Sequence, residues 1–483
     1  MKILKNYIYN VGYNLLTIIL PIFTMPYVTG ILSPKSIGIN TATNATITYF
    51  LLAGSLGINI YGSREIAANR DDQKKTSQIF WEIEFLQFIT ITISVGCFIV
   101  FLSFQKQYQN YLLIQSVALI AGLFDISWFF MGLEDFKKTV LRNFMVKIGS
   151  AILIFTLIKD KNDLGLYIAI LSFSQLVGNV TMWPYLRKLV DFPEIKNLRI
   201  FRHLRPAISL FIPQVAIMIY LTVNKTMIWK IDSVTASGFY DYTDKIIKIT
   251  LAVVTSLGVV LLPRMTNLFS KNEHEEIERY LKYSATAMLC ISIAITMGIA
   301  AVGQTFVNCF FKPAYHEIGI LMIIEAPVVV LIAMSNLIGR QFLIPTRRNK
   351  EFTLSVTYGA ISNIILNVPA IMLWGVRGAM AATVVAEFVI TYYQIMVYRK
   401  TMSVRKLFEG SWKYLVAAVI MFIPTFYLSN QLESGYRNYR NLLIEIMVGM
   451  VIYITANIIL RTPAVKIFRE FVQNNLKNKI RGK

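Results

Sequence analysis

Charged residues are scarce in this sequence. Only 16% of its 483 residues are charged and 55% are hydrophobic, whereas about a quarter of the residues in a soluble protein are charged. One or two soluble domains of this length would have to leave much of that apolar surface in water. A soluble protein is therefore excluded, and the composition predicts an integral membrane protein.

Cysteine and histidine are also rare. The three cysteines, Cys97, Cys290 and Cys309, have no paired spacing and lie in or beside apolar runs, so we expect neither disulfides nor a metal cluster. The three histidines are isolated, which argues against a zinc site. The sequence contains no Walker-type phosphate loop, HExxH motif or nucleophile–base pattern. We therefore expect neither enzymatic activity nor a bound cofactor, and a coupling sodium ion or proton is left open.

Long apolar runs fill most of the chain. A helix needs about 20 apolar residues to cross the hydrocarbon core. Runs of roughly this length predict fourteen transmembrane helices at 8–31, 37–61, 79–104, 111–132, 143–158, 164–186, 207–229, 236–262, 283–302, 318–338, 353–374, 378–398, 412–428 and 441–460. The first run continues past Pro21 to about Leu32 without a cleavage signal, so we interpret it as a retained span.

The net charge of +21 is explained by topology. With the N-terminus inside, the cytoplasmic segments carry 35 Lys and Arg and the outer segments carry 9. Because positive residues favour the cytoplasmic side, this bias predicts that both termini are cytoplasmic. The basic residues lie between apolar runs, so we expect no nucleic-acid partner. Every outer loop is short, which leaves no room for an external domain.

The chain divides into four predicted regions. They are a six-helix lobe at 1–190, a basic cytoplasmic linker at 191–206, a second six-helix lobe at 207–400, and two additional helices with a basic tail at 401–483. Because six spans return the chain to the cytoplasmic side, the two lobes would form a parallel pseudo-repeat about an axis along the membrane normal. Gly38 and Arg64 in the first lobe have the same 26-residue separation as Gly238 and Arg264 in the second.

Charged residues inside spans mark candidate functional positions. The densest group is Asp241, Asp244, Lys245 and Lys248 on the span 236–262. The i,i+4 spacing predicts pairs of Asp241 with Lys245 and of Asp244 with Lys248. The group is either a self-neutralised ladder that anchors the span or a polar wall of a central cavity.

Two further spans carry polar residues that would line such a cavity. Gln214 and Lys225 lie on the span 207–229, and Lys225 has no acidic residue at i,i+4. Asn40 and Asn44 form a polar stripe on the span 37–61. The alternatives are purely structural roles, in which Lys225 extends to the outer interface and the asparagines form hydrogen bonds to neighbouring helices.

Four other residues complete the candidate set. Arg64 and Arg264 end their spans at the cytoplasmic side, where they either anchor the helix or form a cationic collar at the inner mouth. Glu325 and Asp125 are acids that lie away from span ends, and either would suit a coupling ion. Each is also explained as a hydrogen-bond partner in helix packing.

Four stretches in order resemble bacterial oligosaccharide flippases, the Wzx type within the multidrug/oligosaccharidyl-lipid/polysaccharide exporter superfamily. They are the Tyr-Asn-Leu-Leu…Pro-Tyr…Leu-Ser-Pro…Gly pattern of 13–38, Gly-Ser-Arg-Glu-Ile-Ala at 62–67, Gly-Phe-Tyr-Asp-Tyr-Thr-Asp-Lys-Ile at 238–246, and Pro-Thr-Arg-Arg-Asn-Lys-Glu-Phe-Thr at 345–353. The resemblance implies two six-helix lobes around a central cavity in a bacterial plasma membrane. It also implies alternating-access export of a polyprenyl-pyrophosphate-linked oligosaccharide, alongside other polysaccharide-assembly membrane proteins. It transfers no functional residue.

Four alternatives remain at this point, of which one, a structural or scaffold membrane protein, would not need charged residues inside its spans. A peptidoglycan-precursor flippase has the same number of spans. An ion-coupled drug exporter should have a cavity dominated by unpaired acids, whereas spans seven and eight here carry basic groups. A membrane-embedded polysaccharide polymerase should expose a substantial external loop, and this sequence predicts none.

Overall fold

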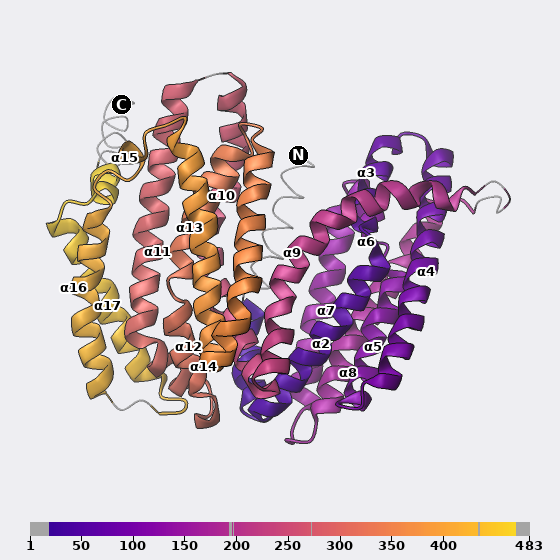
Figure 1. Cartoon of the computed structure of the whole chain (residues 1–483), viewed down its shortest axis with the longest axis horizontal. Coiled ribbons are helices and arrows are strands. Elements are labelled where there is room, and N and C mark those ends of the chain that lie inside the picture. Colours follow the sequence, from indigo (N-terminus) through magenta and orange to yellow (C-terminus); the bar gives the residue numbers. More distant parts are fainter. Residues whose placement is uncertain (1–18, 193–195, 197, 272, 433–434, 470–483) are drawn as a thin grey trace, which may run out of the picture. The chain divides into compact units, whose positions relative to one another are not determined.

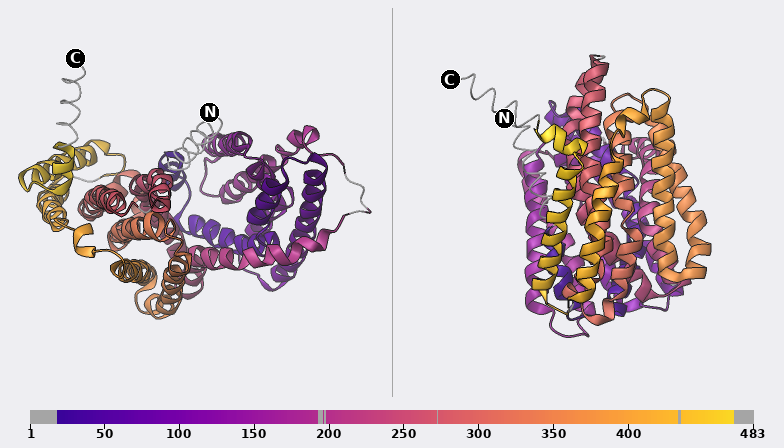
Figure 2. Two further views of the ribbon diagram at one scale, coloured as in Figure 1. Left: turned by 90° about the horizontal axis from the view of Figure 1, so that it is seen from above. Right: turned by 90° about the vertical axis from the view of Figure 1, so that its left-hand side faces the viewer.

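The computed structural model describes residues 19–192, 196, 198–271, 273–432 and 435–469. These residues are mostly helical, and none of them forms a strand. The chain separates into two compact units, Met1–Gly238 (unit 1) and Phe239–Lys483 (unit 2). Figures 1 and 2 show the helices of each unit from three directions. The lobe and linker boundaries given above remain predictions.

Long apolar helices dominate both units. Among the described residues, eight helices are long and apolar enough to span a membrane, and there are nine if the bent pair Pro313–Glu325 and Val328–Leu343 is one span. The first predicted span is described only from residue 19, where Ile19–Thr29 is a short apolar helix. The all-α, multi-pass membrane fold is confirmed, whereas the count of fourteen crossings remains a prediction.

Unit 1 combines long helices with short helical segments. Its elements are α2 (Pro34–Ser55), α3 (Ile58–Asn69), α4 (Gln73–Phe104), α5 (Gln109–Ala121), the 3₁₀ turn η1 (Gly122–Phe124), α6 (Ser127–Gly132), α7 (Phe136–Leu157), α8 (Leu164–Val180), η2 (Trp183–Lys188), η4 (Ile200–His203) and α9 (Leu204–Ile231). Capping side chains fix two helix starts, because Ser33 accepts a bond from the Ser36 amide and Asp72 from the Lys75 amide. α5 packs against α8, and α2 packs against α4.

Unit 2 begins within α10, whose first residues, Val234–Gly238, still belong to unit 1. Its elements are α10 (Val234–Ser270), α11 (His274–Phe310), η5 (Pro313–Tyr315), α12 (Glu317–Glu325), α13 (Val328–Ser335), the π-helical segment η6 (Asn336–Leu343), α14 (Asn349–Arg399), α15 (Val404–Leu407), α16 (Trp412–Gln431) and α17 (Tyr439–Ile459). α11 packs against α12, α13, α16 and α17, so the two C-terminal helices attach to unit 2 through α11.

Three spans that the sequence predicts as continuous are broken. The span 37–61 is interrupted at Leu56 and Gly57, whose φ angles of 41° and 75° are left-handed. The span 111–132 is divided into α5, η1 and α6, with Asp125 in an extended conformation. The span 318–338 bends by 45° between α12 and α13, next to Pro327. Hydrophobicity averaged over a span does not reveal such breaks, because it carries no information about backbone conformation.

α14 contains the two predicted spans 353–374 and 378–398. Gly375 separates them with φ 57° and ψ −141°, a conformation that favours glycine. A Cβ atom added at Gly378 would lie 1.9 Å from the Ala370 carbonyl oxygen. The two halves therefore form a hairpin, and at Gly378 they approach more closely than a residue with a side chain would allow.

The two glycines of the predicted repeat lie against each other at the end of unit 1. A Cβ atom at Gly38 would lie 1.9 Å from the Val234 carbonyl oxygen, and one at Gly238 would lie 2.7 Å from the Gly38 amide nitrogen. The first turns of α2 and α10 therefore meet backbone to backbone, which explains why both positions require glycine.

Candidate functional site

The acidic and basic residues of α10 form the predicted ladder. Lys245 Nζ donates to Asp241 Oδ2 and Lys248 Nζ donates to Asp244 Oδ2, each over 2.6 Å. The aspartate side chains are 4% and 15% exposed, whereas those of Lys245 and Lys248 are 46% and 51% exposed. The predicted i,i+4 pairing is confirmed. The ladder therefore buries its acids and presents half-exposed ammonium groups.

Glu325 lies at the end of α12, where the membrane helix breaks. It is 1% exposed, and its Oε2 atom has no hydrogen-bond partner within the described residues. Asp244, Lys248 and Glu387 are close enough to interact with it electrostatically. A buried carboxylate beside two other acids is costly to keep charged, so a bound proton or cation would reduce that cost at this position.

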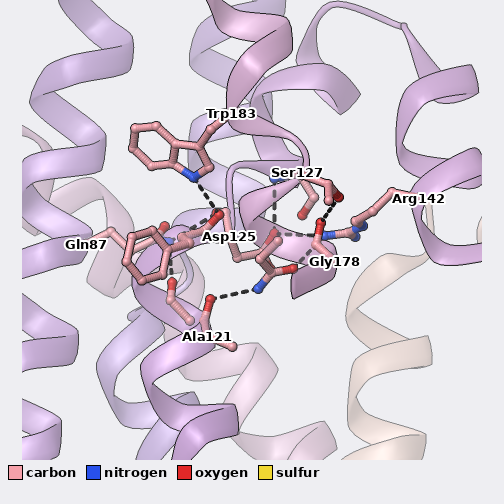
Figure 3. A network of polar contacts seen from close by, with 11 residues as sticks. Gln87, Ala121, Asp125, Ser127, Arg142, Gly178 and Trp183 are labelled. Atoms are coloured by element: carbon pink, nitrogen blue, oxygen red, sulfur yellow. Dashed lines mark hydrogen bonds and ion pairs between the residues drawn. The ribbon is translucent and has the colours of Figure 1, made fainter. Parts of the chain in front are cut away.

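Asp125 lies at the break between α5 and α6, within a network that joins this break to α4, α7, α8 and η2 (Figure 3). The Gln87 side-chain amide donates to the carbonyl oxygens of Gly122 and Asp125, at 2.7 and 3.1 Å. Trp183 Nε1 donates to the Phe124 carbonyl at 3.0 Å. These side chains add donors to carbonyl groups at the break, where the regular i→i+4 hydrogen bonds of the membrane helix end.

The Asp125 carboxylate already has partners in this network. Its Oδ1 atom accepts from the Ser127 amide at 3.1 Å and lies 3.8 Å from Arg142 Nη1. Arg142 Nη1 donates to Asn179 Oδ1 at 2.6 Å, and Asn179 Nδ2 donates to the Ala121 carbonyl at 2.7 Å (Figure 3). The network thus joins α7 and α8 to the break between α5 and α6.

Sequence reasoning missed Arg142, Gln87 and Asn179 as part of this site. Arg142 is one residue before the predicted span 143–158, so it counted as a cytoplasmic cation. Gln87 and Asn179 are single amides in apolar runs, and only the polar character of each residue marks it. Their partners lie 35 or more positions away, so no local spacing reveals the network.

Asn40, Asn44 and Lys225 lie in unit 1. Asn40 is half-buried and its Oδ1 atom has no partner within the described residues, whereas Asn44 is exposed. Lys225 is half-buried, and its carbonyl accepts from Ser237 Oγ at 2.8 Å. The next residue, Thr226, bonds to the Tyr49 hydroxyl at 3.0 Å and so links α9 to α2. A cavity that joins these residues to the α10 ladder remains a prediction.

The other candidates give less information. Arg64 on α3 is exposed. The side chains of Gln214 and Arg264 lie outside the described part of the structure. The predicted collar at the inner mouth therefore remains a prediction.

The predicted linker is fastened to α3 and α4 at Glu82. Arg202 Nη2 lies 2.6 Å from Glu82 Oε2, and His203 Nε2 lies 2.7 Å from the same oxygen. The Tyr61 hydroxyl bonds to His203 Nδ1 at 2.6 Å, and the Arg199 amide donates to Glu82 Oε1 at 2.8 Å. Burial lowers the pKa of His203 below its usual value, although the Glu82 carboxylate acts in the opposite direction.

Sequence and structure comparisons agree with this architecture. The family profile described as polysaccharide biosynthesis protein matches residues 3–269, and that of the lipid II flippase MurJ matches residues 139–448. A putative O-antigen transporter of Escherichia coli (strain K12) is 23% identical over 390 residues, which cover 79% of this chain and 93% of the relative. A protein of the same description from Shigella dysenteriae is 23% identical over 386 residues, covering 78% and 94%.

The fold is also found among solved structures. The lipid II flippase MurJ in its inward closed conformation matches with a TM-score of 0.67 at 13% identity, covering 94% of this chain and 99% of that one. The polysaccharide biosynthesis protein profile matches more than half of the sequence, which is sufficient to assign the chain to that family. The chain therefore belongs to the polysaccharide biosynthesis protein family, as a Wzx-type flippase of the multidrug/oligosaccharidyl-lipid/polysaccharide exporter superfamily.

Proposed function

We propose that this protein moves a polyprenyl-pyrophosphate-linked oligosaccharide repeat unit from the cytoplasmic to the outer leaflet of a bacterial plasma membrane by alternating access. The observation that carries the proposal is the family match over residues 3–269, together with two putative O-antigen transporters that align over almost their whole length. The 35-to-9 charge bias supports cytoplasmic termini. The activity would supply repeat units for a surface polysaccharide.

The substrate's pyrophosphate would be recognised by cations and amides. Lys225 and the half-exposed ammonium groups of Lys245 and Lys248 supply the positive charge, and Asn40 and Asn44 supply amide donors. Because each α10 lysine is already paired with an aspartate, the pyrophosphate would share or displace these carboxylates. Transient binding of this kind suits a substrate that must be released.

The remaining polar candidates have supporting roles in this proposal. Arg64 and Arg264 would attract the anionic head at the cytoplasmic side, and Gln214 would add a donor on the seventh predicted span. With an inside-negative membrane potential, outward movement of negative charge is favourable by about 2.3 kcal/mol per charge per 100 mV. The potential can therefore drive export directly.

A coupling ion would bind at Glu325 rather than at Asp125. Glu325 is buried with an oxygen that lacks a partner within the described residues, and it faces two further acids and Lys248. Asp125, by contrast, is held by the Ser127 amide and Arg142. A proton or sodium ion at Glu325 would neutralise charge beside Asp244 and so change the α10 ladder.

Deletion of the gene in its native host tests the flippase function. We expect sugar-loaded carrier lipid to accumulate in the inner leaflet and surface glycan to disappear. The wild-type gene on a plasmid should reverse both effects. Unchanged surface glycan would refute the proposal. Accumulation of the peptidoglycan precursor instead would assign the protein to the alternative substrate.

A further inference from the structure

A groove runs along the surface of unit 1 between α7 and α8. Its volume is about 470 Å³, within the range of roughly 300–1,000 Å³ that is usual for ligand sites. Small and apolar side chains line it, among them Met145, Gly149, Leu153, Ala169, Phe173 and Val177. The i,i+4 spacing from Met145 through Gly149 to Leu153 places these residues on one face of α7.

Small residues keep the groove open. A Cβ atom added at Gly149 would have no heavy atom within 4 Å, so the space above this residue is empty. The rims are exposed apolar side chains, since Met145, Phe173 and Val177 are 52%, 51% and 58% exposed. An apolar ligand would therefore cover surface that the helices themselves leave uncovered.

The length of the groove matches one bilayer leaflet. It extends along α7 from Arg142 to Leu153, which corresponds to about 16 Å at the helical rise of 1.5 Å per residue. The hydrocarbon core of a bilayer is about 30 Å thick, so one leaflet is about 15 Å deep. A fatty acyl chain is of this length, whereas a polyprenyl chain is much longer.

Positive charge is confined to one end. Of the described residues that line the groove, Arg142 alone is charged. Lys138 lies one turn earlier on the same face of α7, 3.0 Å from Asp135 Oδ2 and 5.4 Å from the ring of Tyr185, so a lipid phosphate would share this ammonium group with Asp135. The charge bias places this end of α7 at the cytoplasmic side. The groove thus joins a cationic end at the interface to an apolar channel inside the membrane.

We propose that this groove binds an anionic phospholipid of the cytoplasmic leaflet, with one acyl chain along α7 and α8 and the phosphate near Lys138 and Arg142. Apolar area selects the chain, and the two cations select the charge of the head group. Because Arg142 also bonds to Asn179 beside Asp125, the bound lipid would support the helices around the break between α5 and α6. The proposal does not depend on the transported substrate.

The test measures lipid that stays with the purified full-length protein. Gly149→Phe fills the empty space, and Gly96→Phe on α4 is its matched control, because a Cβ atom at Gly96 also meets nothing within 4 Å. After extraction in a mild detergent, phospholipids are quantified by mass spectrometry. We expect the wild type and Gly96→Phe to retain phosphatidylglycerol above its share in the membrane, and Gly149→Phe to lose that excess.

A charge variant tests the head-group end. Lys138→Gln should lower the preference for phosphatidylglycerol over phosphatidylethanolamine about fivefold, the effect of one cation beside an anionic lipid. Ala169→Phe fills the groove from α8 and replaces Gly149→Phe if that variant does not give a monodisperse protein. Equal retention in the filled and control variants would overturn the proposal. So would equal retention of neutral lipid, or displacement of the phospholipid by polyprenyl phosphate.

Discussion

Glu325 and Asp125 are both acids at interrupted membrane helices, but their surroundings differ. Asp125 is held by a backbone amide and lies 3.8 Å from a guanidinium, whereas one oxygen of Glu325 has no partner within the described residues. A group that binds and releases an ion must have a free position for it. A carboxylate at a helix break thus has a structural role in unit 1 and a candidate coupling role in unit 2.

Replacement of Glu325 tests this difference. Glu325→Gln keeps the size of the side chain but removes its charge, so transport driven by an imposed proton or sodium gradient should fall by about 5–150-fold, the usual range of coupling between sites. The measurement is translocation of labelled substrate in membrane vesicles. Glu445→Gln on α17 is the control, because Glu445 is equally buried and its oxygens also lack a hydrogen-bond partner within the described residues, but it lies in the C-terminal pair of helices and not beside the α10 ladder. A gradient response that survives in Glu325→Gln would contradict the proposal.

His203 predicts a pH dependence of stability. Because burial lowers its pKa in the folded protein below the ordinary value of 6.5, the unfolded chain takes up the proton first as pH falls. The neutral histidine therefore stabilises the fold above about pH 6.5, and this contribution is lost as pH falls toward the folded-state pKa.

The corresponding measurement is thermal unfolding of the detergent-solubilised protein between pH 8 and pH 5. His203→Gln should flatten the decline in melting temperature below pH 6.5, whereas His316→Gln, at an exposed position, should leave it unchanged. Identical profiles for the wild type and His203→Gln would show that this histidine does not control acid stability.

At the scale of elements, local features could be predicted and nonlocal ones could not. The α10 ladder follows from i,i+4 spacing and is present as expected. The contact of Arg142 with Asn179 joins α7 to α8 and has no counterpart in sequence spacing. The break at Asp125 was missed because its stabilising donors, Gln87 and Trp183, come from other elements.

The hairpin within α14 gives a prediction about close packing. Gly378→Ala places a methyl group against the Ala370 carbonyl oxygen and should destabilise the protein by about 1–3 kcal/mol, the usual cost of overpacking. Gly298→Ala on α11 meets nothing within 4 Å and should be neutral or slightly stabilising. Thermal unfolding of both variants checks the pair, and equal melting temperatures would mean that the hairpin opens easily.

At the scale of the whole molecule, composition and charge distribution suffice for the class of fold. Apolar runs predict the membrane helices, and Lys and Arg positions predict their direction. The cavity residues are harder to predict, because Lys225 on α9 and Lys248 on α10 belong to different units and only tertiary structure decides what they face. Sequence therefore predicts where polar residues enter the membrane better than what they bind.

The predicted topology can be tested with single cysteines in a variant that lacks Cys97, Cys290 and Cys309. Lys161 and Arg187 are both exposed; Lys161 precedes α8 and Arg187 follows it, so they lie beyond opposite ends of this helix. A membrane-impermeant maleimide should label Lys161→Cys in intact cells, but Arg187→Cys only after permeabilisation. The reverse pattern would place the N-terminus outside.

The fastening of the linker at Glu82 has a mechanical consequence. Glu82 holds the chain at Arg199, Arg202 and His203, immediately before α9 begins at Leu204. α9 therefore begins directly after a segment that is bound to α3 and α4. A force that tilts α9 would be transmitted through these contacts to α3 and α4, so we expect the three helices to move together.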